Sequence, residues 1–227
     1  MRHLFIVAHP DDEILGAGAY IYDLIKQGEE VAVEIFNTCD ITRYIDNYNQ
    51  IVTDLKKSHK VLGIEKAYLH QYKDSNFHLA NHRDMVIDIE EVLSDFTPDY
   101  VYTHHPADIN QDHAVISQSC MEAFRIGQRC RYTTPPIKGL YMMEVQSSTE
   151  WGVNPAIEQF RPNTFVNVSQ EGLEKKIESL KCYENVIREY PHPRCRENIT
   201  ALARYRGSQC GKTLAESFQC VYRNGVD

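Results

Sequence analysis

Two short polar stretches of this sequence carry the residue types that bind metal ions and activate water. The first, Ala8-His9-Pro10-Asp11-Asp12-Glu13, directly follows the apolar run Leu4-Phe5-Ile6-Val7. A histidine and an aspartate on one tight turn can bind a divalent cation together. A third ligand would then come from the second stretch, His104 to His113, which is rich in histidine and aspartate. The simpler alternative is that an aspartate of the first stretch only caps a helix.

Strands and helices that alternate along the chain must position these stretches. Apolar, strand-favouring runs predict strands over residues 4–7, 31–36, 66–69, 100–103, 139–143 and 164–167. Helical periodicity predicts helices from Asp11 or Asp12 to Gly28 and over residues 43–62, 83–96, 112–129, 173–190 and 196–206. Residues 215–222 are expected to form a last strand or a turn.

This alternation is typical of an α/β fold with a mainly parallel sheet and helices on both faces. No linker, repeat or low-complexity tract divides the sequence, so we expect a single domain over residues 1–227. In the doubly wound strand order 3-2-1-4-5, the first and fourth strands are neighbours, and the order reverses between them. The two polar stretches follow these two strands. The topology therefore predicts that His9, Asp12 and His113 lie together.

Two histidines and one carboxylate form a ligand set that suits zinc and leaves a position open for water. Zinc lowers the pKa of a bound water to about 7 and polarises a carbonyl group. Asp11, next to the expected ligand Asp12, is placed to accept the proton of that water. Asp112 is the candidate partner for the second ring nitrogen of a ligating histidine, whereas removal of Asp108 is expected to have little effect on metal content. If Asp11 were only a helix cap, the base would be sought among Asp108, Asp112 and Glu13. Fe²⁺ or Co²⁺ could occupy the same ligands.

Composition narrows the classes of protein to which this chain can belong. The net charge is −8, which argues against a nucleic-acid partner because phosphate binding needs a basic face. No apolar run approaches the roughly 20 residues that span a bilayer, so no membrane partner is expected. The segment around the first strand is too short for the apolar region of a signal peptide, which favours a cytoplasmic location. The cysteines have no Cys-x-x-Cys spacing and are expected to be free thiols.

The two polar stretches, in this order, resemble a known family. Ala-His-Pro-Asp-Asp-Glu at 8–13, followed by His-His-Pro-x-Asp-x-Asn-x-Asp-His at 104–113, is similar to the motifs of the PIG-L/LmbE-like zinc-dependent N-deacetylases. Weaker similarity is found in residues 141–151, 206–207, 211 and 215–218. The resemblance implies a Rossmann-like fold and removal of an N-acyl group, often acetyl. The substrate would be a small amino sugar or an N-acetylglucosamine-type conjugate.

The resemblance also assigns roles to individual residues. His9, Asp12 and His113 match the metal ligands of the family, and Asp11 matches its general base. Many members have His-x-x-His in the second stretch, where the first histidine stabilises the charged intermediate. Here that position is Asn110, a neutral donor. Asn110 could act together with zinc, and the alternatives that could replace it are His104, His105 and His192.

Substrate contacts are harder to assign from the sequence. Polar side chains of the surrounding segments could reach the pocket, and the indole of Trp151 could stack on a sugar ring. The polar candidates are Arg43, Asp74, Arg125, His192 and Arg194.

Two other functions stay open at this point. A metal-dependent phosphoesterase would use the same ligands, but no glycine-rich phosphate cradle or basic cluster follows the first strand. A non-catalytic, metal- or ligand-binding member of the fold would have no use for Asp11 beside the ligands. The oligomeric state is not fixed by the sequence, and a homo-oligomer is one option.

Overall fold

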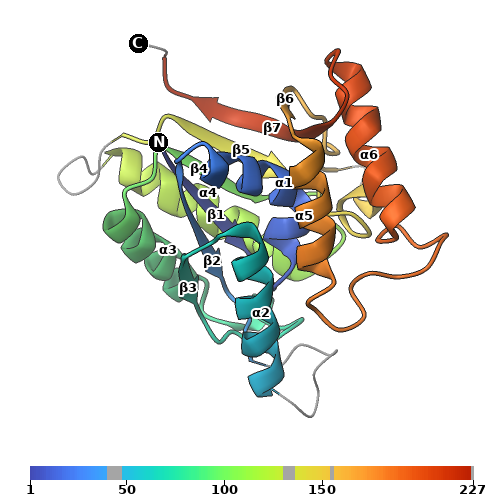
Figure 1. Ribbon diagram of the computed structural model, residues 1–227. Coiled ribbons are helices and arrows are strands. Elements are labelled where there is room, and N and C mark those ends of the chain that lie inside the picture. The colour runs from blue at the N-terminus through green and yellow to red at the C-terminus, as the bar shows by residue number, and fades with distance from the viewer. Residues whose placement is uncertain (40–47, 130–135, 154–155, 226–227) are drawn as a thin grey trace.

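A single seven-stranded sheet forms the centre of the described structure (Figure 1). The computed structural model describes residues 1–39, 48–129, 136–153 and 156–225. The strands are β1 (Arg2–Val7), β2 (Glu30–Ile35), β3 (Lys66–Leu69), β4 (Tyr100–His104), β5 (Gly139–Met143), β6 (Thr164–Asn167) and β7 (Ala215–Arg223). Their order across the sheet is β3-β2-β1-β4-β5-β7-β6. The predicted order 3-2-1-4-5 is therefore confirmed, and two further strands extend it.

The first five strands run parallel to one another, and the last two add an antiparallel edge. β1 lies between β2 and β4, with parallel pairing on both sides. β7 pairs antiparallel with both β5 and β6. The strand order reverses between β1 and β4, so the segments after these strands meet at the same edge of the sheet. This edge carries both polar stretches.

Helices cover both faces of the sheet, as the α/β pattern predicts (Figure 1). They are α1 (Asp12–Lys26), α2 (Tyr48–Leu62), α3 (His82–Phe96), α4 (Gln111–Arg129), α5 (Gln170–Leu180) and α6 (Arg196–Gln209). Alternate residues of β1 serve the two faces, because side chains in a strand point in opposite directions. Phe5 and Val7 pack in the core beneath α1, α2, α5 and α6. Leu4 and Ile6 pack in the core beneath α3 and α4.

The predicted extent of one helix differs from the observed one. The helix predicted over residues 173–190 is wrong at both ends, because α5 begins at Gln170, where the Ser169 side chain caps it, and ends at Leu180. Beyond Leu180 the chain turns, and Tyr183 and Val186 pack into the core from this turn. The periodicity of these apolar residues therefore reflects burial and not a helix. The predicted start of the second helix at Arg43 lies outside the described residues, and α2 is described from Tyr48.

Other expectations concern the last strand, the cysteines and the membrane. Residues 215–223 form the strand β7, which settles the choice between a strand and a turn. The cysteines within the described ranges are free thiols, as expected. In the same ranges, every helix is too short or too polar to cross a bilayer.

Candidate metal centre and active site

The first polar stretch forms a tight turn between β1 and α1. The N–H of Asp12 donates to the carbonyl of His9 (3.3 Å), and the backbone of Asp11 takes the left-handed conformation with φ 103°. The side chain of Asp11 makes no capping hydrogen bond to α1, although the residue occupies the cap position. The carboxylate lines a pocket instead. A left-handed backbone is uncommon for residues other than glycine and is typical of functional sites.

Three ligand atoms from the two stretches form a nearly equilateral triangle. Oδ2 of Asp12 lies 3.3 Å from Nδ1 of His9 and 3.2 Å from Nε2 of His113, and the two histidine nitrogens are 3.3 Å apart. Two ligands that each lie about 2.0–2.1 Å from a tetrahedral zinc ion are about 3.3–3.4 Å apart. All three side chains are buried. The predicted ligand set is therefore brought together in an arrangement that can hold a metal ion.

Each histidine of this triangle has a carboxylate at its other ring nitrogen. Nε2 of His9 lies 3.1 Å from Asp74 and 3.3 Å from Asp112. Nδ1 of His113 lies 3.1 Å from Oδ2 of Asp108. Such carboxylates fix the tautomer and the orientation of a ligating histidine. Asp112 is in the expected position, whereas Asp74 and Asp108 are partners that the sequence did not predict.

Asp108 and Asp112 are themselves held by further hydrogen bonds. The carboxylate of Asp108 accepts bonds from the hydroxyls of Ser148 and Thr149. Asp112 accepts bonds from the backbone N–H groups of Ser75 (2.6 Å) and Phe77 (3.2 Å). The hydroxyls come from the segment after β5, and the N–H groups from the segment after β3. Four loops at one edge of the sheet therefore build the site together.

The charges of the cluster favour a cation at its centre. Burial opposes ionisation of Asp12, but His113 and His9 hold the pKa of its carboxyl well below the usual range. Burial would lower the pKa of His113, yet Asp12 and Asp108 raise it to about 9. For His9, burial is outweighed by hydrogen bonds to Asp112, Asp12 and Asp74, and the pKa is raised. Without a metal, protons occupy this site, and a divalent cation would take their place.

An open pocket of about 400 Å³ lies over the triangle. The functional side chains that line it are His9, Asp11, Asp12, Asp74, Asn110, His113 and Arg194. Oδ1 of Asn110 accepts a hydrogen bond from the backbone N–H of Asp112 (2.9 Å) at the start of α4. This bond leaves the two amide hydrogens of Asn110 for a ligand. Asn110 can therefore both cap α4 and donate into the pocket.

Arg194 brings a guanidinium group close to Asp11. Its Nε donates to the hydroxyl of Ser147 (2.6 Å), and its Nη1 lies 3.5 Å from Oδ2 of Asp11. The side chain is mostly buried. Among the predicted substrate contacts, Arg194 and Asp74 line the pocket.

The other histidine candidates of the second stretch do not line the pocket. Nε2 of His104 accepts a hydrogen bond from the N–H of Ala8 (2.9 Å), and its ring stacks on that of His113. Burial lowers the pKa of His104 to about 3, so the ring is neutral. His105 accepts a bond from the N–H of Ala107 and packs against Phe160. His104 is therefore a buried support for His113.

The remaining candidates among the described residues do not line the pocket. His192 accepts a hydrogen bond from the backbone N–H of Arg194 and does not line the pocket. Arg125 is exposed on α4, Trp151 is 61% exposed, and Arg43 lies outside the described residues. Sequence reasoning missed the roles of Asp108, Ser148 and Thr149. The sequence did contain a signal for Asp108. A ligating histidine usually has a carboxylate partner, and the stretch that contains His113 has a second carboxylate besides Asp112.

Comparison with known proteins identifies the family. The family model for PIG-L, described as GlcNAc-PI de-N-acetylase, matches residues 4–124, which include both polar stretches. The chain belongs to this family. The "Uncharacterized deacetylase YaiS" of Escherichia coli K12 is 28% identical over 193 aligned positions, and the match covers 80% of this chain and 90% of YaiS. The prediction of an N-deacetylase enzyme is confirmed at the level of the family.

Solved structures with the same fold include more than one kind of enzyme. The N,N'-diacetylchitobiose deacetylase of Pyrococcus horikoshii is 18% identical, with a TM-score of 0.75 over 97% of this chain and 83% of that chain. GalB of Pseudomonas putida KT2440, a 4-carboxy-2-hydroxymuconate hydratase, is also 18% identical. It has a TM-score of 0.74 over 100% of this chain and 99% of that chain. These similarities show the predicted fold, and the site itself must indicate the reaction.

Proposed function

We propose that this PIG-L family member hydrolyses the N-acetyl group of an amino sugar or an N-acetylglucosamine-type conjugate, with zinc held by His9, Asp12 and His113. One observation carries the proposal: the ligand triangle lies at the base of an open pocket, with Asp11 beside it and outside the triangle. A purely structural metal site has no need of a further carboxylate in that position. We also propose that residues 1–227 form one domain and that the protein is located in the cytoplasm.

The ligand set fits zinc by donor type and by spacing. Two imidazole nitrogens and one carboxylate oxygen are ligands that catalytic zinc sites use, with a fourth position for water or substrate. When bound, zinc would polarise the amide carbonyl and make water more acidic. Asp74, Asp108 and Asp112 would orient the two histidines through their other nitrogens. Fe²⁺ or Co²⁺ would suit the same donors.

The residues of the pocket can supply the remaining steps of amide hydrolysis. Asp11 would accept a proton from water as the oxygen attacks the carbonyl carbon. It would then return this proton to the amide nitrogen as the C–N bond breaks, which releases acetate and a free amine. Asn110 and Arg194 offer N–H donors on the pocket wall for the negative charge that develops on the carbonyl oxygen.

The character of the pocket supports a polar substrate of sugar size. Carboxylate, amide, hydroxyl and guanidinium groups line its wall, and such groups bind sugar hydroxyls through hydrogen bonds. Diacetylchitobiose, the substrate in the name of the Pyrococcus enzyme, is an N-acetylated sugar of this kind. A phosphoester is a weaker candidate, because Arg194 is the only arginine or lysine among the described residues that line the pocket.

Acetate release from a panel of substrates tests the proposal. The zinc-loaded protein would be incubated with N-acetylated mono- and disaccharides and, in parallel, with sugar phosphates and other phosphoesters. We expect acetate release from at least one N-acetyl sugar and no phosphate release. His9→Ala, Asp12→Ala and His113→Ala should each lose the metal and the activity. Phosphate release alone, or metal retention in all three variants, would overturn the proposal.

A further inference from the structure

Helix α1 is interrupted one turn after the candidate metal site. Ala17 has φ −149° and ψ 17°, which are not helical values, so α1 consists of a short first segment and a longer second one. The first segment carries Asp12 and follows Asp11. In a regular helix the N–H of Ala19 would donate to the carbonyl of Leu15. Sharp bends of this kind have an identifiable cause, and a buried ion pair contacts the backbone on both sides of this one.

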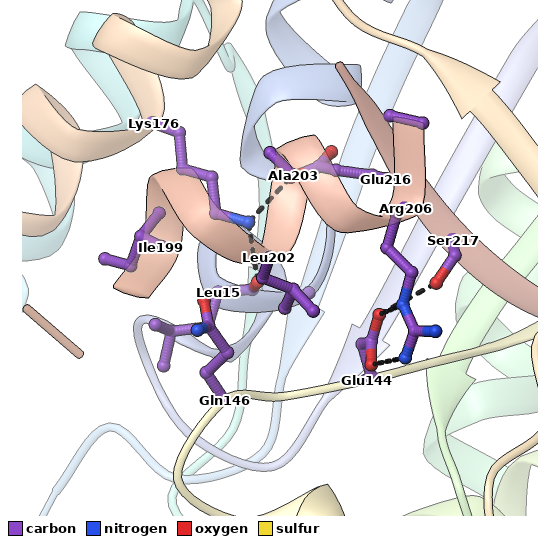
Figure 2. Close-up of a pocket in the computed structure, with 12 residues that line it drawn as sticks. Leu15, Glu144, Gln146, Lys176, Ile199, Leu202, Ala203, Arg206, Glu216 and Ser217 are labelled. Carbon is purple, nitrogen blue, oxygen red and sulfur yellow. Dashed lines mark hydrogen bonds and ion pairs between the residues drawn. The ribbon is translucent and has the colours of Figure 1, made fainter. Parts of the chain in front are cut away.

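Lys176 of α5 and Glu216 of β7 connect the backbone groups on the two sides of the interruption. Nζ of Lys176 donates to the carbonyl of Leu15 (2.8 Å) and to Oε1 of Glu216 (2.6 Å) (Figure 2). The carboxylate of Glu216 accepts bonds from the N–H groups of Ala19 (3.3 Å) and Tyr20 (2.8 Å). The ion pair therefore joins the two groups that a regular helical bond would join directly.

The charges of this pair match the ends of the two helical segments. Glu216 lies at the start of the second segment, where the helix dipole favours a negative charge. Lys176 lies at the end of the first segment, where a positive charge is favoured. Both side chains are at least 94% buried. An unpaired charge at this depth would be costly, so each residue depends on the other.

Two glycines allow the interruption to pack closely against its surroundings. A Cβ atom on Gly16 would lie 3.0 Å from Cβ and Sδ of Met143 at the end of β5. A Cβ atom on Gly18 would lie 2.7 Å from Ile14 and 3.0 Å from Lys176. The first segment of α1 therefore rests directly on the end of β5. Its orientation is set by these contacts and by the ion pair.

We propose that Lys176 and Glu216 are positioning residues of the metal centre: the ion pair keeps α1 interrupted and thereby orients Asp11 and Asp12 in the pocket. This inference rests on the proposed metal site. It explains why a charged pair is kept in the interior, where apolar residues of similar size are often equally or more stabilising. It also gives a role to Glu216 in residues 215–218, one of the weaker sequence similarities.

The decisive variant removes both charges together. In Lys176→Met/Glu216→Leu, no buried charge is left unpaired, and the N–H of Ala19 can bond to the carbonyl of Leu15. We expect the fold and the thermal unfolding midpoint to be retained, while the affinity for zinc falls by about 10- to 100-fold, as for other residues that orient metal ligands. Chelator competition measures this affinity without any substrate. A crystal structure of the metal-free variant should show a continuous α1.

A second ion pair in the same region, which is partly buried, provides the matched control. Arg206 of α6 binds Glu144 through two hydrogen bonds of 2.6 and 2.7 Å, and Ser217 also donates to Glu144 (Figure 2). The hydrogen bonds of these three side chains connect them to one another and to α6. Arg206→Met/Glu144→Leu should therefore leave zinc affinity close to that of the wild type. An equal loss of affinity in both double variants would overturn the inference, because it would show a general loosening of this region.

Single variants keep the test informative if the double variant does not fold. Glu216→Gln has the same shape and keeps one acceptor, so we expect a smaller loss of zinc affinity than in the double variant. Wild-type affinity in Glu216→Gln together with wild-type affinity in Lys176→Met would contradict the proposed role. Failure of the wild type to release acetate would count against the proposed function, but the zinc measurements would still test the positioning role.

Discussion

His113 and Asp108 form a directed pair on the side of the imidazole ring that faces away from Asp12. Nδ1 of His113 lies 3.1 Å from Oδ2 of Asp108, while Nε2 lies 3.2 Å from Asp12. Burial would raise the pKa of Asp108, but hydrogen bonds from His113, Ser148 and Thr149 lower it to about 2. Asp108 therefore stays ionised and holds a proton on Nδ1, which leaves Nε2 available as a metal ligand.

The first prediction tests this pair. Asp108→Asn should lower zinc affinity by about 10- to 100-fold, because an amide in place of the carboxylate no longer fixes the tautomer of His113. Chelator competition gives the affinity, and Asp95→Asn, which changes an exposed carboxylate of α3, serves as the control. Equal affinity in Asp108→Asn and the wild type would mean that Asp108 only secures the loop through Ser148 and Thr149.

The sequence predicted the strand order and the grouping of the candidate ligands correctly, because both follow from patterns of neighbouring residues. The alternation of apolar runs gave the order of the parallel strands, and this order brought His9 and Asp12 next to His113. Tight motifs at the ends of two neighbouring strands leave few geometric alternatives. The convergence of the three candidate metal ligands therefore follows from the amino-acid sequence alone.

Features that depend on distant contacts or on ring orientation were not accessible in this way. Arg194 lies 183 residues from Asp11 in the sequence, and its approach depends on the turns after α5. The choice between Asp108 and Asp112 as partner of His113 depends on which way its ring faces. The extent of α5 was wrong for a related reason, since Tyr183 and Val186 are buried from a turn and mimic helical periodicity.

Asn110 gives the second prediction. Its amide group is positioned by the bond to the backbone of Asp112, so Nδ2 can donate to the carbonyl oxygen of the substrate. Asn110→Ala should lower kcat by about 10²-fold, the lower end for loss of such a donor. It should also cost about 1 kcal/mol of stability, because the cap of α4 is lost. Steady-state kinetics and thermal unfolding separate the two effects.

Asn110→Asp distinguishes the donor from the cap. An aspartate retains the capping oxygen but has no amide hydrogen, so stability should be close to that of the wild type while kcat still falls. Unchanged kcat in this variant would transfer the role to Arg194, the other donor on the pocket wall.

His3, far along β1 from the metal site, gives the third prediction. Its ring stacks on Tyr100 and Tyr102, and Nδ1 lies 3.1 Å from the hydroxyl of Tyr102. Burial lowers the pKa of His3 from 6.5 to about 4. Between these values the unfolded chain binds a proton that the folded protein does not bind. The contribution of His3 to the free energy of unfolding is therefore complete above the pKa of the unfolded chain. It is lost as the pH falls from 6.5 towards 4.

His3→Phe should flatten the acid side of the stability profile. The difference in slope should reach at most about 1.4 kcal/mol per pH unit within the window between the two pKa values. Urea denaturation at several pH values, with a chelator present to exclude metal effects, measures it. The comparison above pH 7 gives the effect of packing alone. Parallel profiles for the variant and the wild type would show that His3 does not contribute to the acid dependence.

Asp11 gives the most specific prediction about the reaction. Asp11→Asn should keep the metal and the fold, because His9, Asp12 and His113 form the ligand triangle without it. The left-handed backbone at this position suits asparagine as well as aspartate. An amide cannot accept the proton of water, so turnover should fall by about 10²- to 10⁴-fold, the usual contribution of a general base. Zinc content and acetate release measure the two outcomes separately.

Each departure from this result points to a different role for Asp11. Loss of zinc from Asp11→Asn would make Asp11 a ligand and would reverse the roles proposed for the two aspartates. Full activity with zinc retained would assign the base to another carboxylate, and Asp74 would then be the first candidate, because it also lines the pocket. Arg194→Met provides the matching control: it removes the neighbouring charge of Asp11 and leaves the carboxylate, so it should reduce turnover without abolishing proton transfer.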